Sequence, residues 1–591
     1  RFPLALCRTT LTTHKRTCQI GRVAILSSLP VVSMHSAGLH LLLDTRIVEN
    51  MQNAELTLGT VKKYSGNPLF SEDKPWETRF DNLYANIIYD DEEQIYKCWY
   101  SPFVVDNSSM GMTREQRKEV RYTAPRDREM AICYCTSKDG ITWDKPELGL
   151  VEYEGSKANN ILWRGGGDTK ILQEGPHGSG VFKDLQDPDP NRRYKAILKS
   201  EILSVAFSAD GIHWAPAIAC PEANSAGDTH NNAFWAPTLG KYVGITRQWG
   251  KPFGRQVAWT SSDDFVNWEK TQIVLEGLDA NQQPYAMTVF YHGGVYLGLV
   301  AIHDQDRDRV WVELTWSPDT RTWHRVLPGT PLIPNTGDEG DYDWGCVYPA
   351  ANPIFLEDEI RLYYGGSDGL HTSWRNGFLC MATLRPDGFA GYKASDVAEL
   401  ATVTTTPVFD GTASLQVSAD IADDGKLVVR VLGEEKQVLA ESEPLTGTVS
   451  EAEVRWRDES ALDAIKTKPA RLQIAFKEAT VYSFSLRPTE KISAHLNAPY
   501  TDRCSQIRDF RIILYVALHP DPAIRRCQTI AGDPSMASHF RTVTRPIRLY
   551  RFNRSAKRDN DQARAREFTV KSSHTFAEAF AHPATPSAKS S

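Results

Sequence analysis

Short apolar or alternating runs recur from about residue 83 to residue 384, and Gly, Asp, Asn or Pro separates one from the next. Runs of this length, rich in Val, Ile, Tyr, Phe and Trp and bounded by turn residues, predict β-strands. The same region lacks the three-to-four-residue apolar periodicity of an amphipathic helix. The pattern therefore predicts an all-β chain.

A turn-like pattern closes many of these runs. Its first two copies read Ser137-Lys-Asp139-Gly140-Ile-Thr-Trp143 and Ser208-Ala-Asp210-Gly211-Ile-His-Trp214, followed by copies at 261–268, with Asp263, and at 317–323, with Asp319. A degenerate fifth copy is at 385–389. In such a turn Asp accepts from backbone amides downstream, and Gly takes the positive-φ position. A period of about 50–70 residues with several strands per unit predicts a five-bladed β-propeller.

Each predicted blade holds three main strands. The innermost strands are expected at 83–89, 179–183, 232–237, 286–291 and 347–355. The second strands are expected at 96–100, 194–199, 242–246, 296–301 and 361–364. The third strands, which lead into the Asp turns, are expected at 130–135, 202–207, 256–260, 310–316 and 377–384.

The propeller topology selects candidate site residues. In a blade, the residues just before the innermost strand and just after the second strand face the same mouth of the central channel. The candidate catalytic residues at this mouth are Asp81, Asp228, Glu339 and Asp343. The candidate substrate-binding residues are Trp76, Asn82, His177, His230, Asn231, Arg247, Trp249, Tyr285, His303 and Asp368. By contrast, Asp184 follows its innermost strand and is expected at the opposite face.

Carboxylates, cations and aromatic rings on one ring of loops suit cleavage of a glycosidic bond. That reaction uses one carboxyl as proton donor and another as base or nucleophile, and crowded carboxyls raise one another's pKa. We assign Asp81 as nucleophile or base and Asp228 or Glu339 as proton donor, with Asp343 tuning the pKa. The remaining polar candidates would bind sugar. Trp76, Trp249 and Tyr285 would stack on it.

The two ends of the chain differ from its middle. Alternating strands between residues 401 and 488, with Gly turns, predict a small β-sandwich. The expected domains are an N-terminal extension at 1–39, the propeller at 40–395, the β-sandwich at 396–490 and a tail at 491–591. Both termini are expected to be disordered.

Composition narrows the function further. The net charge is −7, which argues against a protein that coats nucleic-acid phosphates. No apolar run approaches the ~20 residues of a membrane-spanning helix. The ten cysteines form no C-x-x-C pair, so reduced core thiols are expected, and cytoplasmic localisation is favoured over a secreted or periplasmic one. No metal site or cofactor is predicted.

The region from residue 40 to about residue 488 resembles uncharacterised bacterial relatives of the five-bladed propeller glycosidases. These relatives are similar to glycosyl hydrolase families 32 and 43. Leu41–Glu49, Asn67–Phe70, Lys74–Glu77, Tyr96–Tyr100, Val181–Asp184 and the Asp turns carry the resemblance. The W-M-N-D-P-N-G, R-D-P and E-C segments of characterised β-fructosidases are absent. The resemblance implies the fold and a carbohydrate substrate, without a particular sugar.

The leading hypothesis is a glycoside hydrolase acting on an oligo- or polysaccharide. One alternative is a propeller that binds carbohydrate or acts as a scaffold without catalysis. A third reading is a sialidase-like hydrolase, which needs three arginines and a tyrosine nucleophile; only Arg247 is well placed for that role. Anomeric outcome and oligomeric state do not follow from the sequence.

Overall fold

A computed structural model describes residues 38–108, 111–113, 115–116, 128–165, 175–465 and 469–488. Its regular elements are strands, apart from the short 3-10 helices η1 (Pro190–Arg192), η2 (Pro221–Ala223) and η3 (Glu459–Ile465). The all-β prediction is confirmed. Within the described ranges, no helix is long and apolar enough to cross a bilayer. Most of the predicted N-terminal extension and the tail beyond residue 488 fall outside these ranges.

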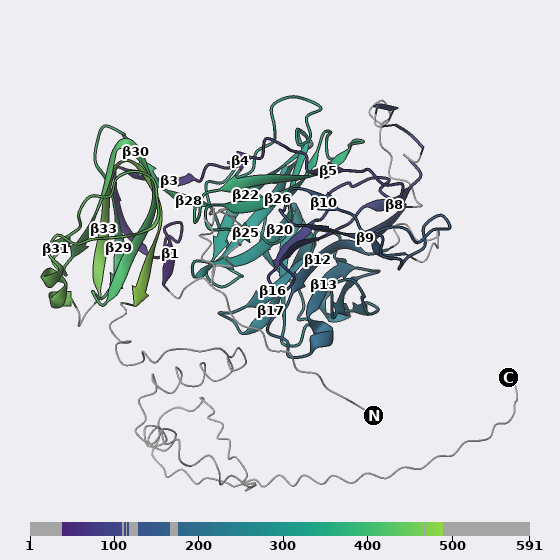
Figure 1. The fold of residues 1–591 in the computed structure, drawn as a ribbon, viewed down its shortest axis with the longest axis horizontal. Helices are drawn as coiled ribbons and strands as arrows, with labels where there is room; N and C mark the ends of the chain where they lie inside the picture. Colours follow the sequence, from purple (N-terminus) through teal and green to yellow (C-terminus); the bar gives the residue numbers. More distant parts are fainter. Residues whose placement is uncertain are drawn as a thin grey trace, which may run out of the picture. The chain divides into compact units, whose positions relative to one another are not determined.

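Five blades follow one another along the propeller part of the chain (Figure 1). The innermost strands are β6 (Asn86–Asp90), β12 (His177–Lys183), β16 (Asn232–Ala236), β20 (Gln282–His292) and β24 (Cys346–Pro349). The second strands are β7 (Ile95–Tyr100), β13 (Tyr194–Lys199), β17 (Lys241–Gly250), β21 (Val295–Asp304) and β26 (Ile360–Ser367). The third strands are β9 (Arg128–Ser137), β14 (Leu203–Ser208), β18 (Gly254–Ser262), β22 (Arg309–Ser317) and β27 (Gly377–Leu384). We call these groups of strands blades I to V in chain order; β22 and β24 join blades IV and V into one ten-stranded sheet.

Short strands complete the blade edges. The outer strands of blades I to IV are β10 (Trp143–Asp144), β15 (Ile218–Ala219), β19 (Gln272–Leu275) and β23 (His324–Arg325). Blades I and V also hold β5 (Phe70–Ser71), β8 (Phe103–Asp106), β11 (Ile161–Arg164) and β25 (Ile354–Phe355). The outer strand of blade V is β4 (Lys62–Lys63), which pairs with β27. The last blade is thus closed by an early segment of the chain.

Buried asparagines join neighbouring blades near the channel axis. The side chain of Asn86 donates to the Ser179 carbonyl at 2.7 Å and accepts from the Val181 amide at 3.0 Å. The side-chain oxygen of Asn232 accepts from the Val289 amide at 2.9 Å. Each bond satisfies backbone groups of an innermost strand that face the next blade, where no ladder partner exists.

Copies one, two and four of the repeated turn form as predicted and the third is shifted by one residue, whereas Asp387 of the degenerate fifth copy contacts His292 and Ser483 instead. The Asp139 carboxylate accepts from the amides of Ile141 and Thr142 at 2.8 Å. In the third copy the equivalent residue is Asp264, which accepts from the Val266 and Asn267 amides. The sequence interpretation had chosen Asp263, one residue earlier. The shift places Phe265, with φ of 65°, at the position that glycine occupies in the first two copies.

The C-terminal region forms one hydrogen-bonded sheet of nine strands. These are β1 (Leu39–Leu41), β2 (Val48–Gln52), β3 (Ala54–Leu58), β28 (Ala390–Ala394), β29 (Ala401–Phe409), β30 (Ala413–Leu432), β31 (Val438–Glu441), β32 (Val449–Glu453) and β33 (Ala470–Pro488). The long strands β30 and β33 pair along most of their length, and the sheet curls around one apolar core (Figure 1). The pairing therefore does not confirm two separate sheets of a β-sandwich. The strands at residues 39–58, which the sequence interpretation had assigned to the propeller, belong to this sheet.

Candidate active site

Asp228 lies just before β16, at one mouth of the channel. His177 and Lys199 face each other across the β12–β13 ladder at the same mouth. The Asp228 carboxylate lies 3.2 Å from Nε2 of His177, 3.6 Å from Nζ of Lys199 and 3.6 Å from Nη1 of Arg247. The hydrogen bond with His177, together with the charges of Arg247 and Lys199, holds the pKa of Asp228 well below its usual range. Its side chain is 41% exposed, so this ionised carboxylate is open to a ligand.

Asp81 belongs to a second group of charges at this mouth. Its carboxylate accepts hydrogen bonds from Arg79 and, at 2.7 Å, from Nη2 of Arg375. Burial alone would raise the pKa of Asp81, but the two guanidinium groups outweigh it and keep the pKa below the ordinary value. Because its side chain is only 14% exposed, Asp81 is less accessible than Asp228.

Asn82 and two tyrosines link blades I, IV and V. The Asn82 amide donates to the hydroxyl of Tyr84 at 2.7 Å and to that of Tyr285 at 2.9 Å. Its carbonyl oxygen accepts from Arg375 at 2.8 Å. The Tyr84 ring lies 5.4 Å from the His177 ring, between centroids. Asn82 thus connects the Asp81 group with the residues around Asp228.

Two arginines and an exposed indole surround Tyr285. The guanidinium carbons of Arg247 and Arg255 lie 4.5 and 5.2 Å from the centre of the Tyr285 ring. Arg255 also lies 4.9 Å from the centre of the Trp249 ring, and Trp249 is 59% exposed. This indole offers an apolar surface next to charged groups, an arrangement that suits a sugar ring.

His303 adjoins a second, partly buried histidine, His371. His303 Nε2 lies 3.0 Å from the Asp308 carboxylate, and its ring centre is 4.2 Å from that of His371. The Tyr348 hydroxyl lies 2.7 Å from Nδ1 of His371. Burial, with nearby Arg375, lowers the pKa of His371 well below the usual value. His371 is therefore neutral at physiological pH and suits hydrogen bonding more than charge stabilisation.

Asp343 and Glu339 lie apart from these groups. The Asp343 carboxylate is fully buried and accepts from Nζ of Lys63 at 2.6 Å and from the Tyr364 hydroxyl at 2.8 Å. These bonds fasten β4 to blade V, so the prediction that Asp343 tunes a mouth carboxyl is replaced by a structural role. Glu339 is exposed in the loop before β24, and no recorded contact within the described ranges joins it to Asp81 or Asp228.

Several predicted binding residues are occupied by structural bonds. Asn231 donates to the backbone carbonyls of Gly178 and Gly227. His230 is buried, and burial lowers its pKa to about 4. Asp368 accepts from the backbone and side-chain amides of Asn376 at 2.8 and 2.6 Å. These side chains support the mouth instead of facing an open ligand position.

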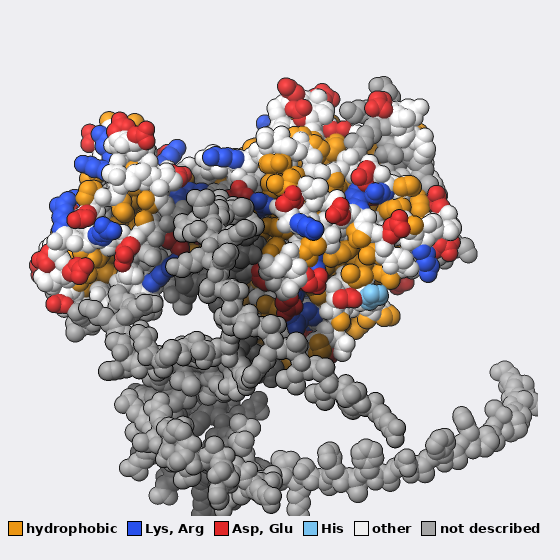
Figure 2. Space-filling view, in the orientation of Figure 1, with side chains coloured by type: hydrophobic (Ala, Val, Ile, Leu, Met, Phe, Trp, Pro, Cys, Tyr) orange, Lys and Arg blue, Asp and Glu red, His pale blue; other side chains and the backbone are white. Residues whose placement is uncertain are grey.

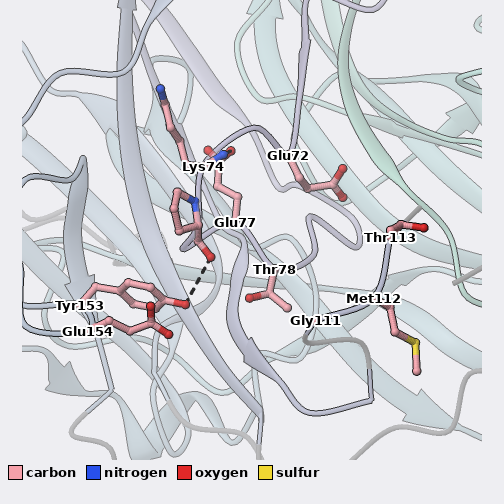
Figure 3. A pocket seen from close by; sticks show the side chains of 10 residues that line it. Glu72, Lys74, Glu77, Thr78, Gly111, Met112, Thr113, Tyr153 and Glu154 are labelled. Atoms are coloured by element: carbon pink, nitrogen blue, oxygen red, sulfur yellow. Dashed lines mark hydrogen bonds between the residues drawn. The ribbon is translucent and has the colours of Figure 1, made fainter. Parts of the chain in front are cut away.

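Trp76 lies beside a separate pocket of about 480 Å³ at the edge of blade I. Its indole donates to Asn160 at 2.7 Å and packs edge-on against Tyr153. Figure 3 shows this pocket, where the Tyr153 hydroxyl donates to the Pro75 carbonyl at 3.3 Å. Burial raises the pKa of Glu77 there despite its ion pair with Lys145 at 2.7 Å. Trp76 is therefore separated from the Asp228 group, and its predicted stacking on the same sugar has no support in these contacts.

The opposite mouth has a different chemistry. Asp184 lies at the far end of β12 from His177, as predicted, and its carboxylate pairs with Lys195 at 2.7 Å. A cavity of about 550 Å³ opens there, lined largely by apolar and aromatic side chains that include Phe182, Phe234 and Phe355. The polar groups suited to catalysis are concentrated at the Asp228 mouth.

The structure adds basic residues that the sequence rule missed. Arg128 and Arg309 are the first residues of β9 and β22, Arg255 is the second residue of β18, and Arg375 comes two residues before β27. In each blade the third strand begins at the same mouth where the second strand ends, because the two strands run antiparallel and are consecutive in the blade. Including that position in the rule would have found these arginines.

Comparison with known proteins gives similarity at the level of solved structures. No family model matches the chain, and no curated protein matches it. One similar structure belongs to the GH130 family of mannoside phosphorylases, which is described as containing glycoside hydrolases that target β-1,2 mannosidic linkages in Candida mannan. Its sequence is 15% identical to this chain, and the TM-score is 0.39. The matched region covers 56% of this chain and 95% of that one.

Two further similar structures are described as proteins with different activities. A glycosyl hydrolase from Bacteroides ovatus is 14% identical, with a TM-score of 0.40, and covers 56% of this chain and 95% of that one. An N-acetylgalactosamine deacetylase from F. plautii, in complex with blood group B trisaccharide, is 14% identical with a TM-score of 0.34, covering 56% and 96%. Identities this low transfer neither a substrate nor a catalytic residue to this chain.

Proposed function

We propose that the protein is a glycoside hydrolase whose reacting carboxylate is Asp228. The observation that carries the proposal is the position of Asp228: ionised, 41% exposed, and held by His177, Lys199 and Arg247 at the channel mouth. A charged carboxylate serves as nucleophile or as the base that activates water. The neighbouring Trp249 supports a sugar ring.

This role differs from the proton-donor role that we expected for Asp228. A proton donor near neutral pH needs a raised pKa, whereas the hydrogen bond with His177 and the charges of Arg247 and Lys199 lower the pKa of Asp228. Asp81 is held ionised as well, by Arg79 and Arg375. We therefore assign the base or nucleophile role to Asp228 and a positioning role to Asp81, which fixes the two arginines and, through Arg375, Asn82.

A panel of aryl glycosides and oligosaccharides tests the proposal. The full chain would release reducing ends from at least one member, and Asp228→Asn would abolish that release while the protein keeps its fold. A matched control is Asp279→Asn, since Asp279 is exposed and, among the described residues, its carboxylate accepts only from the amides of Asn281 and Gln282. Equal activity of Asp228→Asn and wild type would refute the assignment.

The second candidate is a propeller that binds carbohydrate without cleaving it. One observation favours this reading: the two carboxyls with an assigned role, Asp81 and Asp228, have lowered pKa values, so neither supplies the acid of a glycosidase pair. Calorimetric binding of an oligosaccharide that stays intact through prolonged incubation would establish it. Cleavage that depends on Asp228 would exclude it.

A further inference from the structure

Arg255 carries a positive charge that the described protein does not neutralise. Its Nη1 donates to the Gln283 side-chain oxygen at 3.0 Å and lies 3.5 Å from Nδ1 of His303. Its Nε is buried without a hydrogen-bond partner. Across the described residues, no carboxylate lies within ion-pair distance of this guanidinium, although most arginines at the mouth have one.

Two carboxylates at this mouth, Asp228 and Asp308, are already engaged. Asp228 is shared among His177, Lys199 and Arg247. Asp308 lies 3.0 Å from Nε2 of His303 and accepts from the Thr372 hydroxyl at 2.6 Å. Positive charge therefore exceeds negative charge around Tyr285, where Arg247 and Arg255 both contact the ring.

This excess is local to the mouth. On the face drawn in Figure 2, acidic and basic side chains are interspersed over the described surface, and the whole chain has a net charge of −7. Withdrawing a charge from water costs free energy unless an opposite charge compensates it. A half-buried guanidinium without an anion, next to an exposed indole, has the character of a binding site whose anion arrives with the ligand.

We propose that the mouth recognises a saccharide bearing a carboxylate, which Arg255 and Arg247 bind while the sugar ring contacts Trp249. A guanidinium presents parallel N–H groups that match the two oxygens of a carboxylate. The proposal rests on the proposed function for its saccharide, and it names an acidic sugar as the substrate class.

Paired ligands test the charge requirement directly. Glucuronate- and galacturonate-containing oligosaccharides, and the methyl ester of each, are titrated into the full chain by calorimetry. The ester keeps the sugar and removes only the negative charge. At least one acid is expected to bind about 10- to 100-fold more tightly than its ester, the range of a charged hydrogen bond. Raising the salt concentration would reduce the difference in affinity between the acid and its ester.

A pair of variants locates the charge. Arg255→Gln is expected to remove most of the preference for the acid and to leave ester binding unchanged. The control is Arg307→Gln, because Arg307 is 73% exposed and lies 3.9 Å from Asp304 near the same mouth; it should retain the preference. Arg255→Lys, which keeps the charge but loses the planar fork, should give an intermediate value. Thermal unfolding of each variant confirms that it is folded.

The outcomes separate this inference from hydrolysis. The acidic saccharide could bind more tightly than its ester, lose this advantage in Arg255→Gln, and stay uncleaved. That result would support the inference and refute the proposed hydrolase. Cleavage of neutral glycosides, unaffected by Arg255→Gln, would overturn the inference and leave the hydrolase intact. Inorganic phosphate and sulfate are titrated alone as a third arm. If either binds through Arg255 while no acidic saccharide does, the anion is a free oxyanion and the inference fails.

Discussion

His177 of blade II and Asp228, which precedes the innermost strand of blade III, lie 3.2 Å apart between Nε2 and Oδ1. The pair spans the seam between two blades, so the position of the carboxylate depends on the register of both. Lys199 and Arg247 approach the same carboxylate from the second strands of these blades. The position of the Asp228 carboxylate thus depends on contacts with three strands of two blades.

Asp228→Asn is expected to lower kcat by about 100- to 10,000-fold, the usual contribution of a positioned acid–base group. The amide keeps the shape of the side chain but cannot act as a base or nucleophile. The melting temperature should fall modestly, because Asp228 is partly exposed but its partner Arg247 is buried. Kinetics on the cleaved substrate and a thermal melt provide both readouts, and an unchanged kcat would rule Asp228 out.

Asp81→Asn is expected to reduce the free energy of unfolding by about 3 kcal/mol, because it leaves buried guanidinium groups without their shared carboxylate. Asp81 has φ of 55°, a conformation that Asn adopts as readily as Asp. The substitution therefore isolates charge from backbone strain. Urea denaturation measures the change, with exposed Asp91→Asn as a control within about 0.5 kcal/mol. Similar losses in both variants would contradict the network.

Trp249→Ala is expected to raise KM by about tenfold at most, with little effect on kcat, because stacking of an aromatic ring contributes about 0.5–1.5 kcal/mol. Stability should be unchanged, since the indole is 59% exposed. Trp76→Ala is the matched comparison: it removes a bond to Asn160 and should lower stability without changing KM. The reverse pattern would place the sugar beside Trp76.

His230 makes stability depend on pH in a defined direction. Burial lowers its pKa to about 4 in the folded protein, against about 6.5 in an unfolded chain. Between pH 6.5 and 4, His230 is therefore protonated in the unfolded state but neutral in the folded state. The free energy of unfolding falls as the pH is lowered through this range. The contribution is full above pH 6.5 and amounts to about 3 kcal/mol.

Denaturant titrations at several pH values measure this dependence. His230→Gln should lower the number of protons taken up on unfolding by about one. It should also make the free energy of unfolding less dependent on pH between pH 6.5 and 4. His213→Gln is the control, because His213 is exposed in a turn beside Asp210. If the two variants gave the same pH profile, His230 would not be the source.

The sequence was most informative where a local rule applies. Short apolar runs and Asp turns located the blade strands to within a few residues, because strand and turn preferences are local. The third turn was displaced by one residue, since Asp263 and Asp264 are adjacent and only the hydrogen bonds distinguish them. The six described cysteines are unpaired and buried, as expected.

The candidate site was only partly predictable. Strand topology brought His177, Asp228 and Arg247 together, because these positions follow from the blade itself. It could not show that Asp343 is bound by Lys63, a residue 280 positions earlier. Nor could it assign β1 to β3 to the C-terminal sheet, since their partners begin at residue 390. Contacts between distant segments leave no local pattern.

The pairing of β4 with β27 has a consequence for synthesis of the protein. Residues 62–63 leave the ribosome long before residues 382–383, to which they pair. At ~5–20 residues per second, this interval lasts on the order of 15–60 s. Throughout it, the early strands have no partner and the first blades have no closed ring. The ring of blades therefore closes only after residue 383 has been synthesised, and the edge of β27 stays unpaired by β4 until that point.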